Sequence, residues 1–379
     1  MPDTAGANYL VLSDMHFGTI ESSMNELRYR EPLIRYIVAN APWREIIFTG
    51  DLLDVNLSTL IRAIEGGAWP GLPAPLFGFR EFIYTLDVQM RESTPPRSLR
   101  DVSRQWVYVP GNHDYKIWDL LATRVIFEDV IASGRPIERG STPLKKYRWV
   151  GNQSFFAGIF QPYRAASDVI VEYPNHEIPF KQGQETMVLT HGHYLDPVQT
   201  RGNGLSDQLQ KATDPMEVER LVRKIFIETA QFQTMANAVS FTKGFRNFFN
   251  ELAGPHGWKN RLRKLWRQMG ESVTRAFFPT ETLRGRSLSS AQLLDIECYL
   301  ETFCRYTKLP RWFVFGHTHR QGIWKTSRLG IEVYNAGSCY LDQGMAITFA
   351  TIRTDGKGQP AVQLVGIDLN GLMRTTQST

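Results

Sequence analysis

Short apolar runs alternate with segments of helical periodicity along the first two hundred residues. Residues 9–12, 46–49 and 106–109 are rich in β-branched and aromatic side chains, and the three runs are followed by Ser13, Gly50 and Pro110-Gly111, respectively. Between the first two runs, residues 25–39 carry apolar side chains at helical spacing. Strands separated by helices predict a layered α/β fold.

Further apolar runs predict more strands, and a helical stretch separates two groups of them. Asp214-Pro215 is typical of a helix start, and Ser289 with Gln292 forms a capping-box pattern for a later helix. The additional strands are expected at residues 155–160, 186–190, 312–315, 331–334, 346–352 and 362–367, with a hairpin turn at 354–358 between the last two. The predicted organisation is a core of residues 1–204 and 310–379 around a mostly helical insertion, residues 205–309, which could cap an active site.

Composition narrows the class of protein. The chain has 379 residues, of which 42% are hydrophobic, so global disorder is excluded. No run approaches the roughly 18 apolar residues of a membrane span, and the first residues carry no basic leader. Because Cys298, Cys304 and Cys339 form neither a CxxC pair nor a disulfide framework, we expect a reducing, cytoplasmic setting.

The net charge of +5 comes from one stretch. Residues 243–275 hold eight Lys or Arg against two Glu, a local balance of +6. Within it, residues 258–278 read as a basic amphipathic helix with Trp and Phe on its apolar face. Such a helix fits an interfacial segment or a cap over an anionic amphiphile, and it equally fits a helix packed on the core with a solvated basic face.

Six of the eight histidines fall in four short motifs at strand ends, and a fifth motif is purely acidic. Loops beyond the carboxyl ends of strands are where open α/β sheets place ligands. The motifs, in chain order, are Asp14-Met15-His16, Gly50-Asp51-Leu52-Leu53-Asp54, Gly111-Asn112-His113-Asp114, His191-Gly192-His193 and Gly316-His317-Thr318-His319.

These residue types indicate a metal centre. Imidazoles, carboxylates and one carboxamide without a thiolate suit Mn, Fe or Zn. A turn in the last motif would let His317 and His319 reach different ions, and the two oxygens of Asp51 could bridge two cations. Gly50, Gly111 and Gly316 would allow backbone bends and close approach.

Together, in this order, the five motifs resemble those of the calcineurin-like metallophosphoesterase superfamily, and they span residues 14–319. The resemblance implies a four-layer αββα sandwich holding two divalent or trivalent metal ions, with Mn favoured and Fe or Zn as alternatives. It implies that Asp14, His16, Asp51 and His319 hold one ion, and that Asp51, Asn112, His191 and His317 hold the other.

The same resemblance assigns roles around the metals. His113 matches a histidine that approaches the substrate to stabilise phosphoryl charge or protonate the leaving oxygen, and Asp114 would orient it. Asp54 would form hydrogen bonds near the site, Arg320 would either support the metal ligands or face the substrate, and His193 would be either structural or substrate-facing. The expected activity is hydrolysis of a phosphodiester, pyrophosphate or phosphomonoester by metal-activated hydroxide, with the monoester least favoured.

Part of the chain is similar to bacterial UDP-diacylglucosamine pyrophosphatases, which have a helical insertion and end their last motif in G-H-T-H-R, as Gly316–Arg320 do here. That group has arginine in place of His113 and H-G-D in place of the motif at His191, so the subgroup stays unassigned. A lipid-linked substrate and peripheral membrane contact through residues 241–278 are therefore one hypothesis. A nuclease, a phosphoprotein phosphatase and a non-catalytic scaffold are the alternatives.

Overall fold

The computed structural model describes most of the predicted core and part of the predicted insertion. The described residues are 6–18, 22–54, 74–114, 132, 134, 147–149, 168–172, 175–195, 287–303, 308–341 and 344–376. The strand predicted at 155–160 and the basic stretch at 243–275 lie outside them.

An eight-stranded sheet forms the larger half of the described structure. Its centre is parallel, because β1 pairs with β2, β2 with β3, and β3 with β5 in the same direction. Antiparallel strands extend it on both sides. The strand order is β13 (Met373–Thr376), β12 (Pro360–Asp368), β11 (Met345–Thr354), β1 (Asn8–Leu12), β2 (Trp43–Thr49), β3 (Ser103–Val109), β5 (Asp168–Val171) and β4 (Tyr147–Trp149).

A five-stranded sheet forms the other half. Its three middle strands are parallel, and an antiparallel strand closes each edge. The strand order is β6 (Asn175–Phe180), β7 (Glu185–Thr190), β8 (Trp312–Phe315), β10 (Glu332–Asn335) and β9 (Gly322–Lys325).

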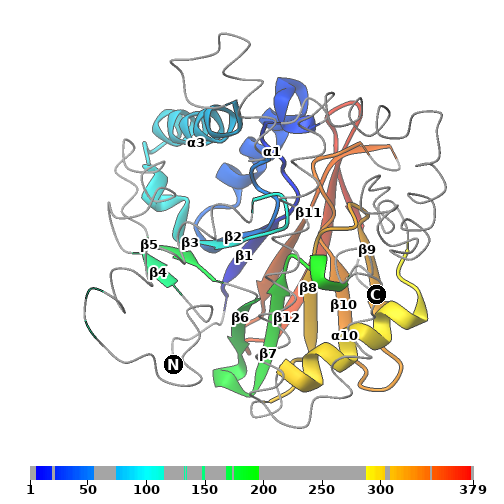
Figure 1. Cartoon of the computed structure of the whole chain (residues 1–379). Helices are drawn as coiled ribbons and strands as arrows, with labels where there is room; N and C mark the ends of the chain where they lie inside the picture. Colours follow the sequence, from blue (N-terminus) through cyan, green and yellow to red (C-terminus); the bar gives the residue numbers. More distant parts are fainter. Residues whose placement is uncertain are drawn as a thin grey trace, which may run out of the picture.

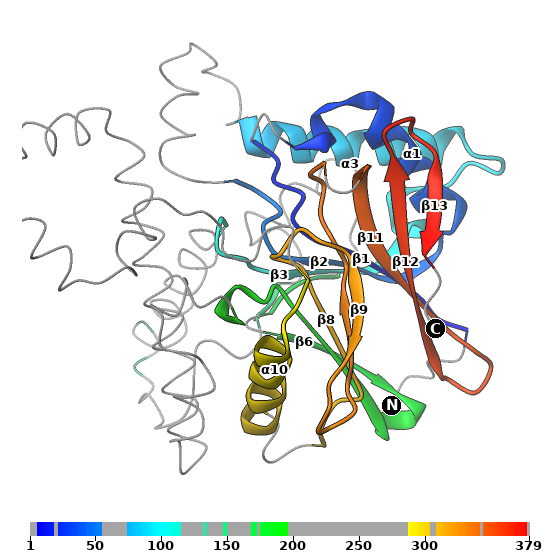
Figure 2. The same ribbon diagram turned by 90° about the vertical axis from the view of Figure 1, so that its right-hand side faces the viewer.

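Helices cover the outer face of each sheet, as Figures 1 and 2 show. Helices α1 (Leu27–Ala39) and α3 (Ala74–Glu92) lie on the larger sheet, and an ion pair of 3.0 Å between Arg30 Nη2 and Glu81 Oε1 joins them. Helix α10 (Ser290–Phe303) covers the smaller sheet. Short 3-10 turns occupy Ser23–Asn25, Leu99–Asp101, Lys181–Gly183 and His193–Leu195.

Three apolar clusters fill the spaces between these layers. In β1, Leu10 and Leu12 point toward the helices, whereas Tyr9 and Val11 point toward the second sheet. Because both faces of the central strands are buried, their sequences are continuously apolar and do not alternate with polar residues. The third cluster joins the outer face of the second sheet to α10. The predicted four-layer αββα sandwich is confirmed.

Helix α10 begins where its sequence predicted. The backbone N–H of Ser289 donates to Gln292 Oε1 at 2.7 Å, and the N–H of Gln292 donates back to Ser289 Oγ at 3.4 Å. This reciprocal pair is the capping box. Apart from residues 287–303 and 308–309, the range predicted as the insertion, 205–309, lies outside the described residues, and so does the predicted helix at 258–278.

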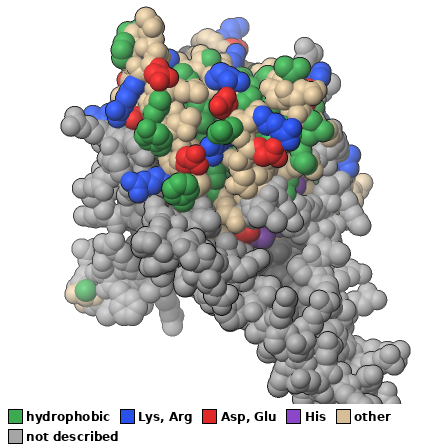
Figure 3. All heavy atoms as spheres, turned by 90° about the horizontal axis from the view of Figure 1, so that it is seen from above, with side chains coloured by type: hydrophobic (Ala, Val, Ile, Leu, Met, Phe, Trp, Pro, Cys, Tyr) green, Lys and Arg blue, Asp and Glu red, His purple; other side chains and the backbone are tan. Residues whose placement is uncertain are grey.

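The surface over α1 and α3 is chemically mixed. Figure 3 shows hydrophobic side chains scattered among basic and acidic ones on the described part of this face. Among the helices that the structure describes, none is long and apolar enough to cross a membrane.

Candidate metal centre

The five sequence motifs come together because they follow strands whose carboxyl ends meet. Strands β1, β2 and β3 are parallel neighbours, as are β7 and β8 in the second sheet. Backbone hydrogen bonds then lock the loops together. The N–H of His16 donates to the Asp51 carbonyl at 2.8 Å, and the N–H of Gly316 donates to the His191 carbonyl at 3.1 Å.

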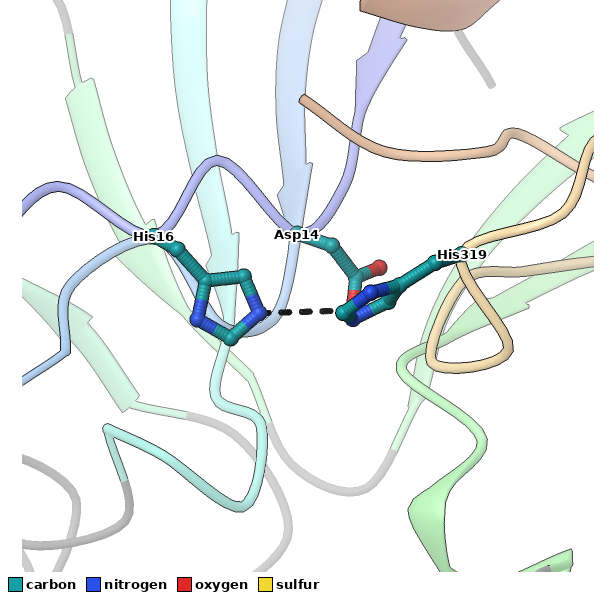
Figure 4. Close-up of side chains that lie close together, drawn as sticks. All are labelled: Asp14, His16 and His319. Carbon is teal, nitrogen blue, oxygen red and sulfur yellow. Dashed lines mark ion pairs between the residues drawn. The ribbon is translucent and has the colours of Figure 1, made fainter. Parts of the chain in front are cut away.

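A first cluster consists of Asp14, His16 and His319, whose ligand-capable atoms lie within 4.8 Å of one another. Figure 4 shows the two imidazoles on opposite sides of the Asp14 carboxylate. Asp14 Oδ1 lies 3.1 Å from His319 Nε2 and 3.9 Å from His16 Nε2. Within the part of the chain that the structure describes, this oxygen and both ring nitrogens of His16 are buried and make no hydrogen bond. Buried polar atoms of this kind are costly unless a partner such as a cation binds them.

A second cluster is centred on His191 Nε2. Asn112 Oδ1 lies 2.9 Å from this nitrogen, His317 Nδ1 3.2 Å and Asp51 Oδ2 3.3 Å. The other ring nitrogen, Nδ1, lies 3.0 Å from the Thr49 carbonyl, which can only accept, so Nδ1 carries a proton. In the neutral imidazole, Nε2 therefore has a free lone pair and lies close to three further atoms that can bind a metal ion. Four such atoms at one point suit a cation.

Asp51 lies between the two clusters. Its Oδ2 is 3.3 Å from His191 Nε2 in the second cluster and 3.7 Å from His16 Nε2 in the first. Its Oδ1 accepts a hydrogen bond of 2.8 Å from the backbone N–H of His113, which fixes the carboxylate plane. A single oxygen thus faces both candidate sites.

Five residues of these clusters share an unusual backbone conformation. Left-handed φ values cost a non-glycine residue about 1–2 kcal/mol and are most often tolerated at functional sites. In Asp14-Met15-His16 and in His317-Thr318-His319 the first and third residues are both left-handed. The φ values are +50° at Asp14, +47° at His16, +48° at Asp51, +63° at His317 and +57° at His319.

Three glycines leave room for these side chains. A Cβ on Gly50 would overlap the His191 ring, one on Gly111 would overlap the Asp51 carboxylate, and one on Gly316 would overlap Ser13 and Asp14. Only Gly50 among these three has a positive φ, +86°. Close approach is therefore the common reason for glycine, and backbone bending is an added reason at Gly50.

Burial and neighbouring charges shift the pKa of Asp14, of Asp51 and of His191 in opposite directions. Burial raises the pKa of Asp14 and of Asp51, but nearby histidines outweigh it and lower both below the usual carboxyl range. Burial lowers the pKa of His191, but the charges of Asp51 and Asp14 raise it to about 9. Without a cation, a proton on His191 balances the two carboxylates. A bound cation would take the place of that proton.

His113 lies at the exposed edge of the centre. Its side chain is 28% exposed, whereas His16 and His191 are almost fully buried. Its Nδ1 is 3.6 Å from Asp54 Oδ1, and its ring packs edge-on against His16 at 4.8 Å. His16, Asp54 and His113 form a third group of ligand-capable atoms. We interpret Asp54 and His113 as a carboxylate–imidazole pair beside the first cluster.

Asp54 is thus the carboxylate beside the His113 ring, whereas Asp114, which was predicted to orient His113, binds backbone amides. Asp114 Oδ1 accepts from the N–H of Gly111 at 2.6 Å, and Oδ2 accepts from the N–H of Leu52 at 2.9 Å. Because both oxygens bind backbone amides, Asp114 ties the second and third motifs together. Burial and the charge of Asp51 raise the pKa of Asp114 to about 6.

Two further predicted residues flank the clusters. His193 is buried, and its ring centroid lies 5.5 Å from that of His191 and 6.5 Å from that of His317. Burial and these two imidazoles lower its pKa well below the usual range. It belongs to none of the ligand-capable groups found in the described residues, which favours the structural alternative. Arg320 follows His319 and is partly buried.

Sequence reasoning missed the last residue of β10 and the loop that follows it. Asn335 Nδ2 donates to the Gly316 carbonyl and to Thr318 Oγ1, both at 2.8 Å, and so braces the last motif. Tyr340 packs against His16 and His319. The available signal was the Asn335-Ala336-Gly337-Ser338 run, which places small and polar residues directly after a predicted strand.

Comparisons with known proteins give structural similarity alone. No protein-family model and no curated protein matches this chain. Among solved structures, a dimetal phosphatase from Danio rerio is 11% identical, with 99% of this chain and 100% of that chain covered and a TM-score of 0.37. A conserved uncharacterized protein from Streptococcus pneumoniae, described as a predicted phosphoesterase, is 12% identical, with 99% of each chain covered and a TM-score of 0.28. GAP50, the anchor in the inner membrane complex of Plasmodium, is 8% identical, with 99% of this chain and 90% of that chain covered and a TM-score of 0.37.

Two sheets packed face to face, helices on both outer faces and five motifs gathered at the strand ends form the arrangement expected from the resemblance of these motifs to those of calcineurin-like metallophosphoesterases.

Proposed function

We propose that this chain is a metal-dependent phosphoesterase that holds two metal ions and hydrolyses a phosphodiester or pyrophosphate in preference to a phosphomonoester. The observation that carries the proposal is the position of Asp51 Oδ2 between two buried clusters of ligand-capable atoms. Two cations sharing a carboxylate are a common arrangement for hydrolysis at phosphorus.

The donor atoms fit the proposed ions. Oxygen and imidazole nitrogen donors without a thiolate suit Mn, Fe or Zn, with Mn favoured. When bound, the two cations would neutralise phosphoryl oxygens and lower the pKa of a water molecule. Asp14, His16 and His319 would hold the first ion, Asn112, His191 and His317 the second, and Asp51 both.

The residues of the chain supply the remaining steps. His113 is the most exposed member of the centre, so a substrate approaching from solvent meets its imidazole first. Asp54 lies beside His113 Nδ1, and although burial raises the pKa of Asp54, this imidazole outweighs it and lowers that pKa. A protonated His113 could neutralise phosphoryl charge and give a proton to the leaving oxygen. Buried Asp114 maintains the loop spacing through two backbone amides.

The proposal also concerns the group that the phosphoryl group of the substrate is attached to. The basic, aromatic composition of residues 241–278 supports an amphiphilic or lipid-linked substrate and peripheral contact with a membrane surface. The same basic residues would also suit a nucleic acid. These residues lie outside those that the structure describes.

Metal analysis and a substrate panel test the proposal together. Purified protein supplied with Mn²⁺ should hold two ions per chain and hydrolyse bis-p-nitrophenyl phosphate faster than p-nitrophenyl phosphate. Nucleotide-linked lipids, single-stranded DNA and a phosphopeptide complete the panel and distinguish the substrate classes. Absence of bound metal after Mn²⁺, Fe²⁺ and Zn²⁺ supplementation would refute the proposal.

A further inference from the structure

Tyr340 packs against both imidazoles of the first cluster. Its ring stacks on His319, with centroids 4.8 Å apart and planes inclined by 16°. The same ring meets His16 edge-on, at 4.9 Å and 80°. Tyr340 is 9% exposed, so this contact lies inside the protein. The ring therefore covers the side of the first cluster formed by these two imidazoles.

The two clusters differ in how their imidazoles are oriented. In the second cluster, the hydrogen bond from Nδ1 to the Thr49 carbonyl fixes the His191 ring. In the first cluster, neither nitrogen of His16 makes a hydrogen bond within the described part of the chain. Metal-binding histidines usually donate their second N–H to a protein acceptor, which fixes ring orientation. Because the torsion of the imidazole about χ2 is otherwise broad, packing must orient His16.

Hydrogen bonds hold the backbone that leads into Tyr340, so the position of its ring is fixed relative to the first motif. The N–H of Cys339 donates to the Asp14 carbonyl at 3.1 Å, and the N–H of Ser23 donates to the Cys339 carbonyl at 2.7 Å. The N–H of Ser338 donates to Thr348 Oγ1 at 2.8 Å. The loop is thus joined to the first motif and to β11, independently of the aromatic contact.

We propose that Tyr340 is a positioning residue of the first metal site, whose ring holds His16 and His319 in the orientation that binds the ion beside Asp14. This inference rests on the proposed binuclear centre. The relevant property is the flat ring, so phenylalanine should replace tyrosine with little loss. Aliphatic residues of similar size should not, because they leave the His16 ring free to rotate.

Metal titration of the metal-free protein tests this role without measuring activity. Mn²⁺ binding is followed by calorimetry, and electron paramagnetic resonance reports whether two ions are close enough to couple. Wild type should bind two ions and give the coupled signal. Y340L should lose roughly 10–100-fold in affinity at one site, as expected when the support of a ligand is removed, and should lose the coupled signal at limiting Mn²⁺. Y340F should restore both to within about twofold of wild type.

Leu341 provides the matched control, since it follows Tyr340 in the same loop and is 60% exposed. L341A should bind both ions as wild type does. Should Y340L fail to fold by circular dichroism, Y340M tests the same loss of the ring with a more adaptable side chain.

The outcomes separate this proposal from the one on which it rests. A wild type that binds fewer than two ions would refute the binuclear centre itself. A wild type with two ions and a folded Y340L or Y340M with unchanged affinity and coupling would refute the role of Tyr340 alone. Equal weakening of both sites, or failure of Y340F to restore binding, would also overturn it, because either result indicates a general structural effect.

Discussion

Among the described residues, the histidine–carboxylate group around His176 and the metal centre are both buried, but their geometry favours opposite roles. In one, His176 lies between Glu172 and Glu45, with each ring nitrogen 2.8 Å from a carboxylate oxygen. In the metal centre, His16 Nε2 is 3.7–3.9 Å from carboxylate oxygens and makes no hydrogen bond among the described residues. The residue types are the same, but 2.8 Å is a direct hydrogen bond, whereas 3.7–3.9 Å is a separation that two ligand atoms can have when each lies about 2.0–2.2 Å from a shared cation.

The comparison shows what distinguishes a structural ion pair from a site that binds metal. The imidazole of His176 has its partners already, and the two glutamates raise its pKa to about 9 against the effect of burial. It joins β2 and β6 across the two sheets. The imidazoles of the centre instead converge with lone pairs toward common points. A buried histidine therefore indicates a metal site only when the hydrogen-bond partners of its ring nitrogens are also considered.

The largest expected effect follows from removing the carboxylate that the two clusters share. Asp51→Asn removes the charge, and an amide oxygen that keeps the hydrogen bond from the His113 N–H would leave an amide nitrogen, which has no free lone pair for metal, in the place of Oδ2. We expect loss of both ions and phosphodiesterase activity below detection, measured by metal analysis and hydrolysis of bis-p-nitrophenyl phosphate. Full activity of this variant would contradict the shared-ligand arrangement.

Replacing His113 should separate catalysis from metal binding. His113→Ala should retain two ions and slow hydrolysis by roughly 10²–10⁴-fold, the usual contribution of a positioned acid. The loss should be smallest for substrates with a good leaving group such as p-nitrophenolate. Asp54→Asn should follow the same leaving-group dependence with a smaller loss, about 10–100-fold. Loss of metal in either variant would place these residues among the ligands.

Filling the space beside Asp51 should weaken the centre without removing any ligand. Gly111→Ala places a methyl group against the Asp51 carboxylate, and we expect a loss of roughly 10–100-fold in metal affinity. Gly356→Ala is the matched control, because a Cβ there meets nothing within 4 Å. Equal affinities in the two variants would show that Asp51 need not hold its observed position.

The smallest expected effect on activity concerns the other histidine group. The pKa of His176 is raised from 6.5 to about 9, so its contribution to stability is fully present below pH 6.5 and is lost as the pH rises through about 9. That contribution is at most about 3 kcal/mol. Urea unfolding between pH 6 and 9.5 should show this loss in the wild type and its absence in His176→Gln, while turnover at pH 7 stays unchanged.

Glu177→Gln on the same strand is the control, because Glu177 is exposed. A flat pH dependence of wild-type stability would refute the charged state of His176. Loss of metal from His176→Gln would contradict the separate roles of the two histidine groups.

The strands that carry the site could be predicted because each apolar run is buried on both faces and ends directly in a ligand motif. Strand β6 was missed because Glu177 and Pro179 interrupt its apolar pattern. Strand β13, with the sequence Met-Arg-Thr-Thr, has too few apolar residues to stand out. The sequence also could not determine which acid faces His113. That choice depends on how two loops turn, and the amides of Leu52 and Gly111 bind Asp114 instead. Tyr340 belongs to no ligand motif, and only the packing of distant loops brings it to His16 and His319.

The most direct test is the location of the ions in crystals grown with Mn²⁺, found by anomalous diffraction. We expect two peaks about 3.5–4 Å apart, one beside Asp14 and His319 and the other beside His191 and His317, with Asp51 in contact with both. A single peak, or two peaks of which only one touches Asp51, would contradict the account.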